Sequence, residues 1–147
     1  MPLKQPKLLA SILIILALFI FSGCGIATSK EIQFGETYYN DQGFSSFNEG
    51  FYNLLPTGKK EEAILHFKDA VESFKKALEI NSDFTDARRN LARVYFIRKE
   101  YARSVEEYKK VVDLVPGDLD ARLAIASAYV KLGRHDEAAF SISPQFR

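Results

Sequence analysis

Residues 85–118 read TDARRNLARVYFIRKEYARSVEEYKKVVDLVPGD, and much of this pattern returns 34 residues later. With that offset, small and apolar residues coincide: Ala87, Leu91, Ala92 and Tyr95 fall over Ala121, Ile125, Ala126 and Tyr129. The same offset aligns ESFKKALEI at 72–80 with EEYKKVVDL at 106–114. A 34-residue period of apolar residues at helical spacing predicts an array of two-helix hairpins.

The repeat resembles the tetratricopeptide repeat, which implies an all-α fold, an α-solenoid of stacked helical hairpins. The resemblance lies in Leu91-Ala92 and Tyr95 on a first helix, Ser104 and Tyr108 on a second helix, and Pro116 after it. Small residues are needed where two helix backbones approach closely. The chain departs from the family where Arg88 and Arg122 replace Trp, Ala92 and Ala126 replace Gly, and Ser104 replaces Ala. These departures are compatible with the same packing.

Three hairpins are expected in a domain covering 43–147, at about 44–81, 85–115 and 119–142. The first helix should run from Phe44 to Leu55 and end at Pro56 and Gly58. Its expected buried residues are Phe44, Phe47, Phe51 and Leu54. The second helix, at about 59–81, should bury Ala63, Phe67, Ala70, Phe74 and Ala77.

The third hairpin is short, because Pro144 stops its second helix soon after it begins at about His135. A terminal repeat usually needs a polar cap over its apolar face. An exposed apolar edge is therefore expected, comprising Leu123, Tyr129, Ala139, Phe140 and Ile142. Two interpretations stay open: short helices fold back over this edge or the gene is truncated, or the edge forms a homodimer or partner surface.

The N-terminal residues 1–23 are typical of a signal peptide. Lys4 and Lys7 precede an apolar run of 14 residues, Leu8 to Phe21, which is shorter than the about 20 residues of a membrane-spanning helix. The segment FSGC at 21–24 resembles the lipobox of bacterial lipoproteins, which implies cleavage before Cys24 and attachment of lipid to its thiol. An uncleaved anchor and ordinary secretion are the alternatives.

Residues 24–42 are predicted to be an acylated cysteine followed by a polar tether. Several acyl chains would anchor the protein stably, because each buried CH2 contributes about 0.8 kcal/mol. Gly25, rather than Asp, follows the cysteine, so the resemblance to lipoproteins implies the outer membrane, facing the periplasm.

The composition argues against several functional classes. The chain has 20 Lys and Arg against 19 Asp and Glu, so a general nucleic-acid binder is not expected. A single cysteine allows neither an internal disulfide nor a cysteine-based zinc site, and two isolated histidines do not suggest a metal cluster. No catalytic or nucleotide-binding motif occurs, so the chain is predicted to be neither an enzyme nor a cofactor binder, apart from the covalent lipid at Cys24.

In the tetratricopeptide family, the first helices of successive hairpins line a groove that receives peptides. The resemblance places Arg89, Asn90, Arg93 and Phe96 in this groove from one hairpin, and Leu123, Ser127 and Val130 from the next. Arg89 and Arg93 share a helix face and could bind a carboxylate by charge-assisted hydrogen bonds. The alternative is that these arginines simply solvate an exposed helix.

The predicted function is a membrane-anchored scaffold for protein–protein interactions in cell-envelope assembly, with an envelope protein or peptide segment as partner. Related lipoproteins help to assemble secretins, outer-membrane barrels or wall-hydrolase complexes. Two alternatives remain: a self-assembling subunit that uses the C-terminal edge, and an accessory subunit of an envelope enzyme.

Overall fold

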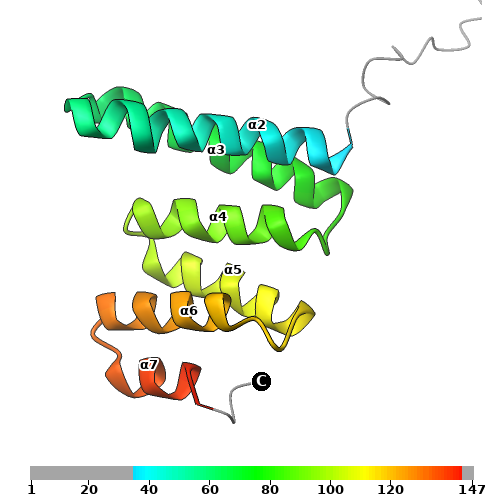
Figure 1. Ribbon diagram of the computed structural model, residues 1–147, viewed down its shortest axis with the longest axis vertical. Coiled ribbons are helices and arrows are strands. Elements are labelled where there is room, and N and C mark those ends of the chain that lie inside the picture. Colours follow the sequence, from blue (N-terminus) through cyan, green and yellow to red (C-terminus); the bar gives the residue numbers. More distant parts are fainter. Residues whose placement is uncertain (1–34, 144–147) are drawn as a thin grey trace, which may run out of the picture. The chain divides into compact units, whose positions relative to one another are not determined.

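A computed structural model describes residues 35–143 of the chain. This part contains six α-helices and no strand, and consecutive helices pair as three antiparallel hairpins (Figure 1). The helices are α2 (Glu36–Asn48), α3 (Lys60–Ile80), α4 (Thr85–Ile97), α5 (Tyr101–Leu114), α6 (Leu119–Lys131) and α7 (His135–Ser141). Two short turns of helix, η1 (Glu49–Leu54) and η2 (Leu55–Thr57), continue α2. The predicted all-α array of helical hairpins is confirmed.

The first helix begins earlier than the sequence pattern indicated. Helix α2 starts at Glu36, so the prediction of a tether over 24–42 is wrong for residues 36–42. Tyr39 packs against the core of the first hairpin, and the Lys76 ammonium lies 5.8 Å from the centre of its ring. These residues show no strong apolar period of their own, and packing against α3 stabilises them as helix.

The buried face of α2 also differs from the prediction. Phe44 is 43% exposed and Phe51 is only partly buried, and the buried residues of α2 and η1 are Gly43, Phe47, Gly50 and Leu54. A Cβ atom at Gly43 would lie 2.6 Å from Cε1 of Phe74, and one at Gly50 would lie 2.9 Å from Cε1 of Phe67. The two glycines therefore let aromatic rings of α3 pack directly against the backbone of α2 and η1.

The predicted face of α3 is confirmed, since its buried residues are Ala63, Phe67, Ala70, Phe74 and Ala77. The predicted close approach of α4 and α5 is also present. There, the buried Ser104 hydroxyl donates a hydrogen bond to the Ala92 carbonyl at 2.9 Å. Because the hydroxyl has a partner, serine fits a position where alanine is usual.

The arginines that replace tryptophan have the same role in two hairpins. Arg88 Nη1 donates to Glu107 Oε2 at 2.9 Å, and Arg122 Nε donates to the Ser141 carbonyl at 3.0 Å. Each contact joins the first helix of a hairpin to the second helix of the same hairpin. Long side chains with several donors thus replace the aromatic contact by hydrogen bonds.

The predicted exposed C-terminal edge is present only in part. Leu123, Phe140 and Ile142 are exposed, whereas Tyr129 is buried. The Arg134 guanidinium lies 4.8 Å from the centre of the Tyr129 ring, and Lys109 approaches the same ring. The turn before α7 therefore covers Tyr129, which sequence spacing alone could not show.

The turns inside the hairpins require a left-handed backbone, with φ of 80° at Gly58, 63° at Lys99 and 73° at Gly133. Lys99 and Gly133 are equivalent positions of the 34-residue repeat. For a residue with a Cβ, this conformation is strained.

Replacing Lys99 by glycine should therefore stabilise the fold, by about 0.5 kcal/mol once the greater entropy of unfolded glycine is included. Chemical denaturation measures the change. The matched substitution Gly133→Ala should lower the free energy of unfolding by about 1 kcal/mol. A lower stability of Lys99→Gly would show that the lysine side chain contributes more than its backbone strain costs.

Candidate functional site

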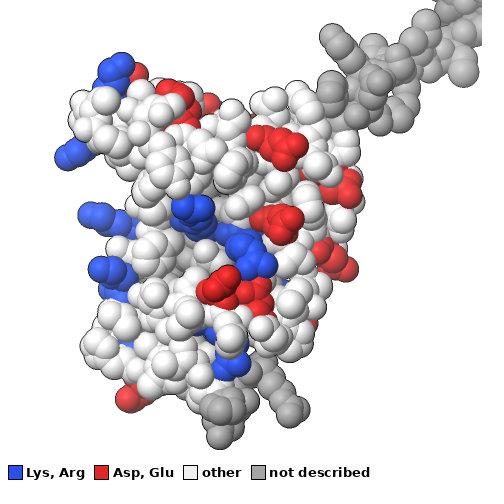
Figure 2. All heavy atoms as spheres, in the orientation of Figure 1, with Lys and Arg blue, Asp and Glu red and all other residues white. Residues whose placement is uncertain are grey.

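The first helices of the hairpins, α2, α4 and α6, run in the same direction on one side of the array (Figure 1). We call the surface that they form the α2–α4–α6 face. Figure 2 shows this face with a group of basic side chains over α4 and acidic side chains beside them. All seven residues of the predicted groove belong to α4 or α6.

Two of the predicted groove residues on α4, Arg89 and Asn90, already have partners within the protein. Arg89 Nη1 forms an ion pair with Asp118 Oδ2 at 2.7 Å, and Asp118 also caps α6 by accepting a hydrogen bond from the Ala121 N–H at 2.9 Å. Asn90 Nδ2 donates to Asn40 Oδ1 of α2 at 3.0 Å. Both side chains therefore hold neighbouring hairpins together, so a carboxylate ligand would have to compete with these contacts.

Arg93 lies against the aromatic side chains of the first hairpin. Its guanidinium carbon is 4.8 Å from the centre of the Phe47 ring, and Nη2 is 3.4 Å from the Tyr52 hydroxyl. The Phe47 ring is in turn stacked on Phe51, with ring centres 5.4 Å apart. A cation over an aromatic face is attracted by the ring quadrupole, which orients Arg93 while leaving the residue exposed.

A pocket of about 240 Å³ opens between α4, α5 and α6, and it contains three of the predicted residues. Its lining is Arg93, Phe96, Ile97, Tyr108, Ala124 and Ser127. Phe96 is held in place by an edge-to-face contact with Tyr101, with ring centres 5.3 Å apart. The pocket therefore has mostly apolar walls, with one guanidinium and hydroxyl groups at its edge.

Leu123 and Val130, the other two predicted residues on α6, lie outside the pocket lining. They are 55% and 51% exposed, which is high for large apolar side chains. They are seven positions apart, so they lie on the same side of α6. The structure thus places Arg93, Phe96 and Ser127 together, Arg89 and Asn90 in contacts between hairpins, and Leu123 and Val130 on open surface.

Tyr108 is the pocket residue that sequence reasoning assigned to packing alone. It comes from the second helix of its hairpin and reaches the pocket between α4 and α6. Burial raises the pKa of Tyr108 above its usual value, so the hydroxyl stays protonated well above neutral pH. Tyr108 occupies an aromatic position of the repeat, which indicated that it packs in the core. The repeat pattern cannot show that a core residue also lines a pocket.

Both a repeat family and solved structures are similar to this chain. Residues 96–142, from the end of α4 to just past α7, match the tetratricopeptide repeat. The chain has the tetratricopeptide-repeat fold. A solved structure of MamA protein is similar over 71% of this chain, with 24% identity and a TM-score of 0.52.

This chain spans about half, 53%, of the length of that MamA structure. A structure titled the second TPR of Spaghetti (RPAP3) bound to the HSP90 peptide SRMEEVD has 17% identity and a TM-score of 0.50. The similarity covers 72% of this chain and 90% of the Spaghetti chain. No curated protein sequence matches the chain.

Two further findings concern residues 35–143 alone. None of the tetratricopeptide-repeat helices described there is long and apolar enough to cross a bilayer. Histidine, cysteine and carboxylate side chains form no cluster of three in this part that could hold a metal ion. Cys24 and residues 1–23 lie outside the described residues, so the lipid attachment remains a prediction.

Proposed function

We propose that the chain is a membrane-anchored scaffold that binds a segment of another cell-envelope protein on the α2–α4–α6 face. The observation that carries the proposal is the apolar pocket beside the exposed side chains of Leu123 and Val130. A pocket for an apolar anchor, next to further exposed apolar area, is typical of surfaces that bind proteins. The Spaghetti structure, which has a similar fold, is bound to the HSP90 peptide SRMEEVD.

The membrane anchor in this proposal rests on the lipobox-like segment at 21–24. Lipid on Cys24 would hold the scaffold at a membrane surface and raise its effective concentration near envelope partners. Replacing Cys24 by serine should move the protein from the membrane fraction to the soluble fraction. An unchanged fractionation would contradict the anchor but not the binding surface.

The binding surface is tested by affinity capture from detergent-solubilised envelopes, read by mass spectrometry. The double variant Leu123→Glu with Val130→Glu adds two charges to the proposed surface without touching the core. Bound partners should be lost, because a carboxylate buried without a partner strongly opposes association. This variant is a cleaner test than changing Arg89, which would also break the ion pair with Asp118.

A matched control is available on α3, outside the α2–α4–α6 face. Leu65 and Ile80 are 62% and 51% exposed, and changing both to glutamate adds the same charge at similar exposure. Partners that survive the control but not the Leu123 and Val130 change would support the proposal. Retention of every partner in both variants would refute it.

Self-association is a second candidate function, favoured by the exposed Ile142 beside α7. The same capture experiment separates the two. If the chain recovers only copies of itself, and Ile142→Glu abolishes that recovery, self-association is supported.

A further inference from the structure

The polar side chains of the α2–α4–α6 face limit what kind of segment can bind there. Arg89, Asn90 and Arg93 already contact Asp118, Asn40 and the Phe47–Tyr52 region. The backbone groups of the three helices are hydrogen-bonded within each helix. An extended segment would bring unpaired backbone N–H and C=O groups to the middle of this face, where Arg89, Asn90 and Arg93 already have partners, whereas a helix satisfies its own backbone.

Charges are ordered along this face from one end to the other. Each of its helices begins with an acidic residue in the first turn, namely Glu36, Asp86 and Asp120. At the other end, Lys131 lies in the last turn of α6. Within residues 35–143, none of these four side chains takes part in an ion pair.

Figure 2 shows the same polarity on the molecular surface. Acidic side chains gather toward the end where α2, α4 and α6 begin, and basic side chains lie over the middle and at the opposite edge. The acidic residues complement the positive N-terminal ends of their own helices. Because the two ends of the face differ in charge, a charged partner would bind more favourably in one orientation than in the other.

The apolar pocket lies between these two charged ends. Its walls of Phe96, Ile97 and Tyr108 suit one large apolar side chain, and Leu123 and Val130 offer further contact along α6. An apolar centre between acidic and basic ends is the complement of an amphipathic helix that carries its own charges at its two ends.

We propose that the bound segment is an amphipathic helix lying antiparallel to α4 and α6. This inference rests on the proposed function and adds the chemistry and direction of the partner. The helix has acidic residues at its N-terminal end, one large apolar side chain for the pocket, and basic residues at its C-terminal end. Asp120 and Lys131 are eleven residues apart, or about 16 Å along α6, so the charged groups of the partner should be separated by about three turns.

Two fluorescent helical peptides of identical composition test this inference against the full-length chain in detergent. The first peptide has an acidic first turn, a central phenylalanine and a basic last turn, and the second has the two charged ends exchanged. Fluorescence anisotropy should show that the first peptide binds at least roughly fivefold more tightly, because several exposed ion pairs each contribute modestly. Added salt should reduce the difference.

The charge-exchanged protein Asp86→Lys, Asp120→Lys and Lys131→Glu should reverse the preference between the peptides. The matched exchange Lys75→Glu with Glu79→Lys, on α3, should leave the preference unchanged. Filling the pocket by Ser127→Trp, at an exposed helical position, should weaken both peptides equally. Circular dichroism verifies that each variant is folded.

Equal binding of the two peptides, or binding of neither, would overturn the inference. The proposed function would still stand if capture from envelopes remained sensitive to Leu123→Glu and Val130→Glu. That combination would mean that the face binds a protein segment of different shape or charge.

Discussion

Replacing Phe74 by alanine is expected to lower the free energy of unfolding by about 3–5 kcal/mol. The Phe74 side chain is fully buried between α2 and α3 and belongs to the core of the first hairpin. The loss combines the transfer free energy of the ring with the cavity that it leaves. Chemical denaturation followed by circular dichroism measures the effect.

The contact between Phe74 and Gly43 allows a sharper version of this experiment. In the native protein, Gly43→Ala should be destabilising by about 1 kcal/mol, because overpacking outweighs the better helix propensity of alanine. In the Phe74→Ala background the steric conflict is absent, so the same change should stabilise by up to about 1 kcal/mol. Gly117→Ala is the control, since a Cβ there meets nothing within 4 Å. If Gly43→Ala changed the free energy of unfolding in the same direction in the native and the Phe74→Ala proteins, the close packing of Phe74 on Gly43 would be contradicted.

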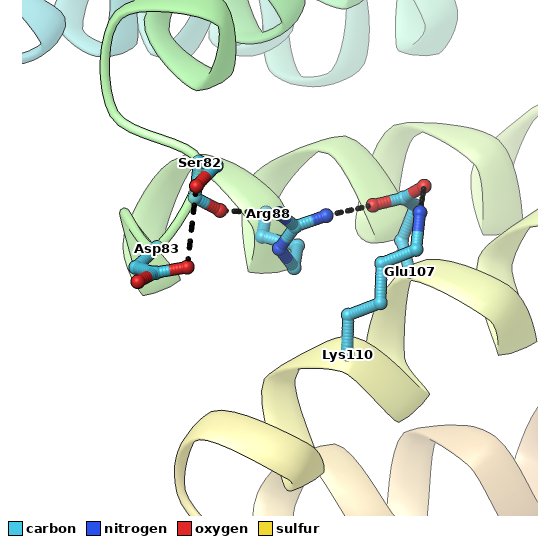
Figure 3. A network of polar contacts seen from close by, with 5 residues as sticks. All are labelled: Ser82, Asp83, Arg88, Glu107 and Lys110. Atoms are coloured by element: carbon cyan, nitrogen blue, oxygen red, sulfur yellow. Dashed lines mark hydrogen bonds and ion pairs between the residues drawn. The ribbon is translucent and has the colours of Figure 1, made fainter.

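Replacing Glu107 by alanine is the other change with a large expected effect, about 2–3 kcal/mol of lost stability. The Arg88 and Glu107 side chains are only 12% and 14% exposed, and their atoms are 2.9 Å apart. Without Glu107, the Arg88 guanidinium retains its contact to the Ser82 carbonyl and loses its counter-charge (Figure 3). The estimate lies below that for a fully buried pair because water still reaches both groups.

Replacing Arg88 should lower the free energy of unfolding by less than replacing Glu107. After Arg88→Leu, Glu107 keeps its ion pair with Lys110 at 2.8 Å (Figure 3). Glu62→Ala, which breaks the exposed pair with Lys59, is the matched control and should cost less than about 0.5 kcal/mol. A loss for Glu107→Ala as small as that of the control would show that the Arg88 pair contributes little.

The hairpins could be predicted because a repeat imposes the same apolar spacing several times. The five residues predicted to be buried on α3, from Ala63 to Ala77, are the five that the structure buries. The small residue Ala92 indicated a close approach of two helices, and in the structure its carbonyl accepts a hydrogen bond from the Ser104 hydroxyl of the neighbouring helix. Such patterns are visible in sequence because a helix face recurs every three to four residues.

The start of α2 and its buried face could not be predicted in this way. Glycines have no side chain that would mark them as buried, and Gly43 is buried only because Phe74 occupies the space above it. The residues after Glu36 carry no strong apolar period, so their helix depends on packing against α3. Gly43 is buried by the Phe74 ring, which is distant in sequence, so its burial cannot be predicted from the neighbouring residues.

The predicted groove residues could be assigned to neighbouring helices, but their contacts could not be predicted. The resemblance to the tetratricopeptide repeat placed Arg93, Phe96 and Ser127 in one groove, and the structure brings these three residues together around one pocket. It could not show that Arg89 is held by Asp118 or that Asn90 is held by Asn40. Because of these contacts, Arg89 and Asn90 are not free to bind a carboxylate.

The sequence by itself determined the class of fold and the hairpin boundaries after residue 59, because these follow from spacing along the chain. Only the tertiary structure decided which polar groups on the α2–α4–α6 face remain available, where its pocket lies and how its charges are ordered. Those properties depend on side chains from different hairpins, such as Arg89 and Asp118, meeting in space. Apolar spacing in the sequence specifies which face of a helix a residue occupies. The side chains that it contacts are specified by how the hairpins stack.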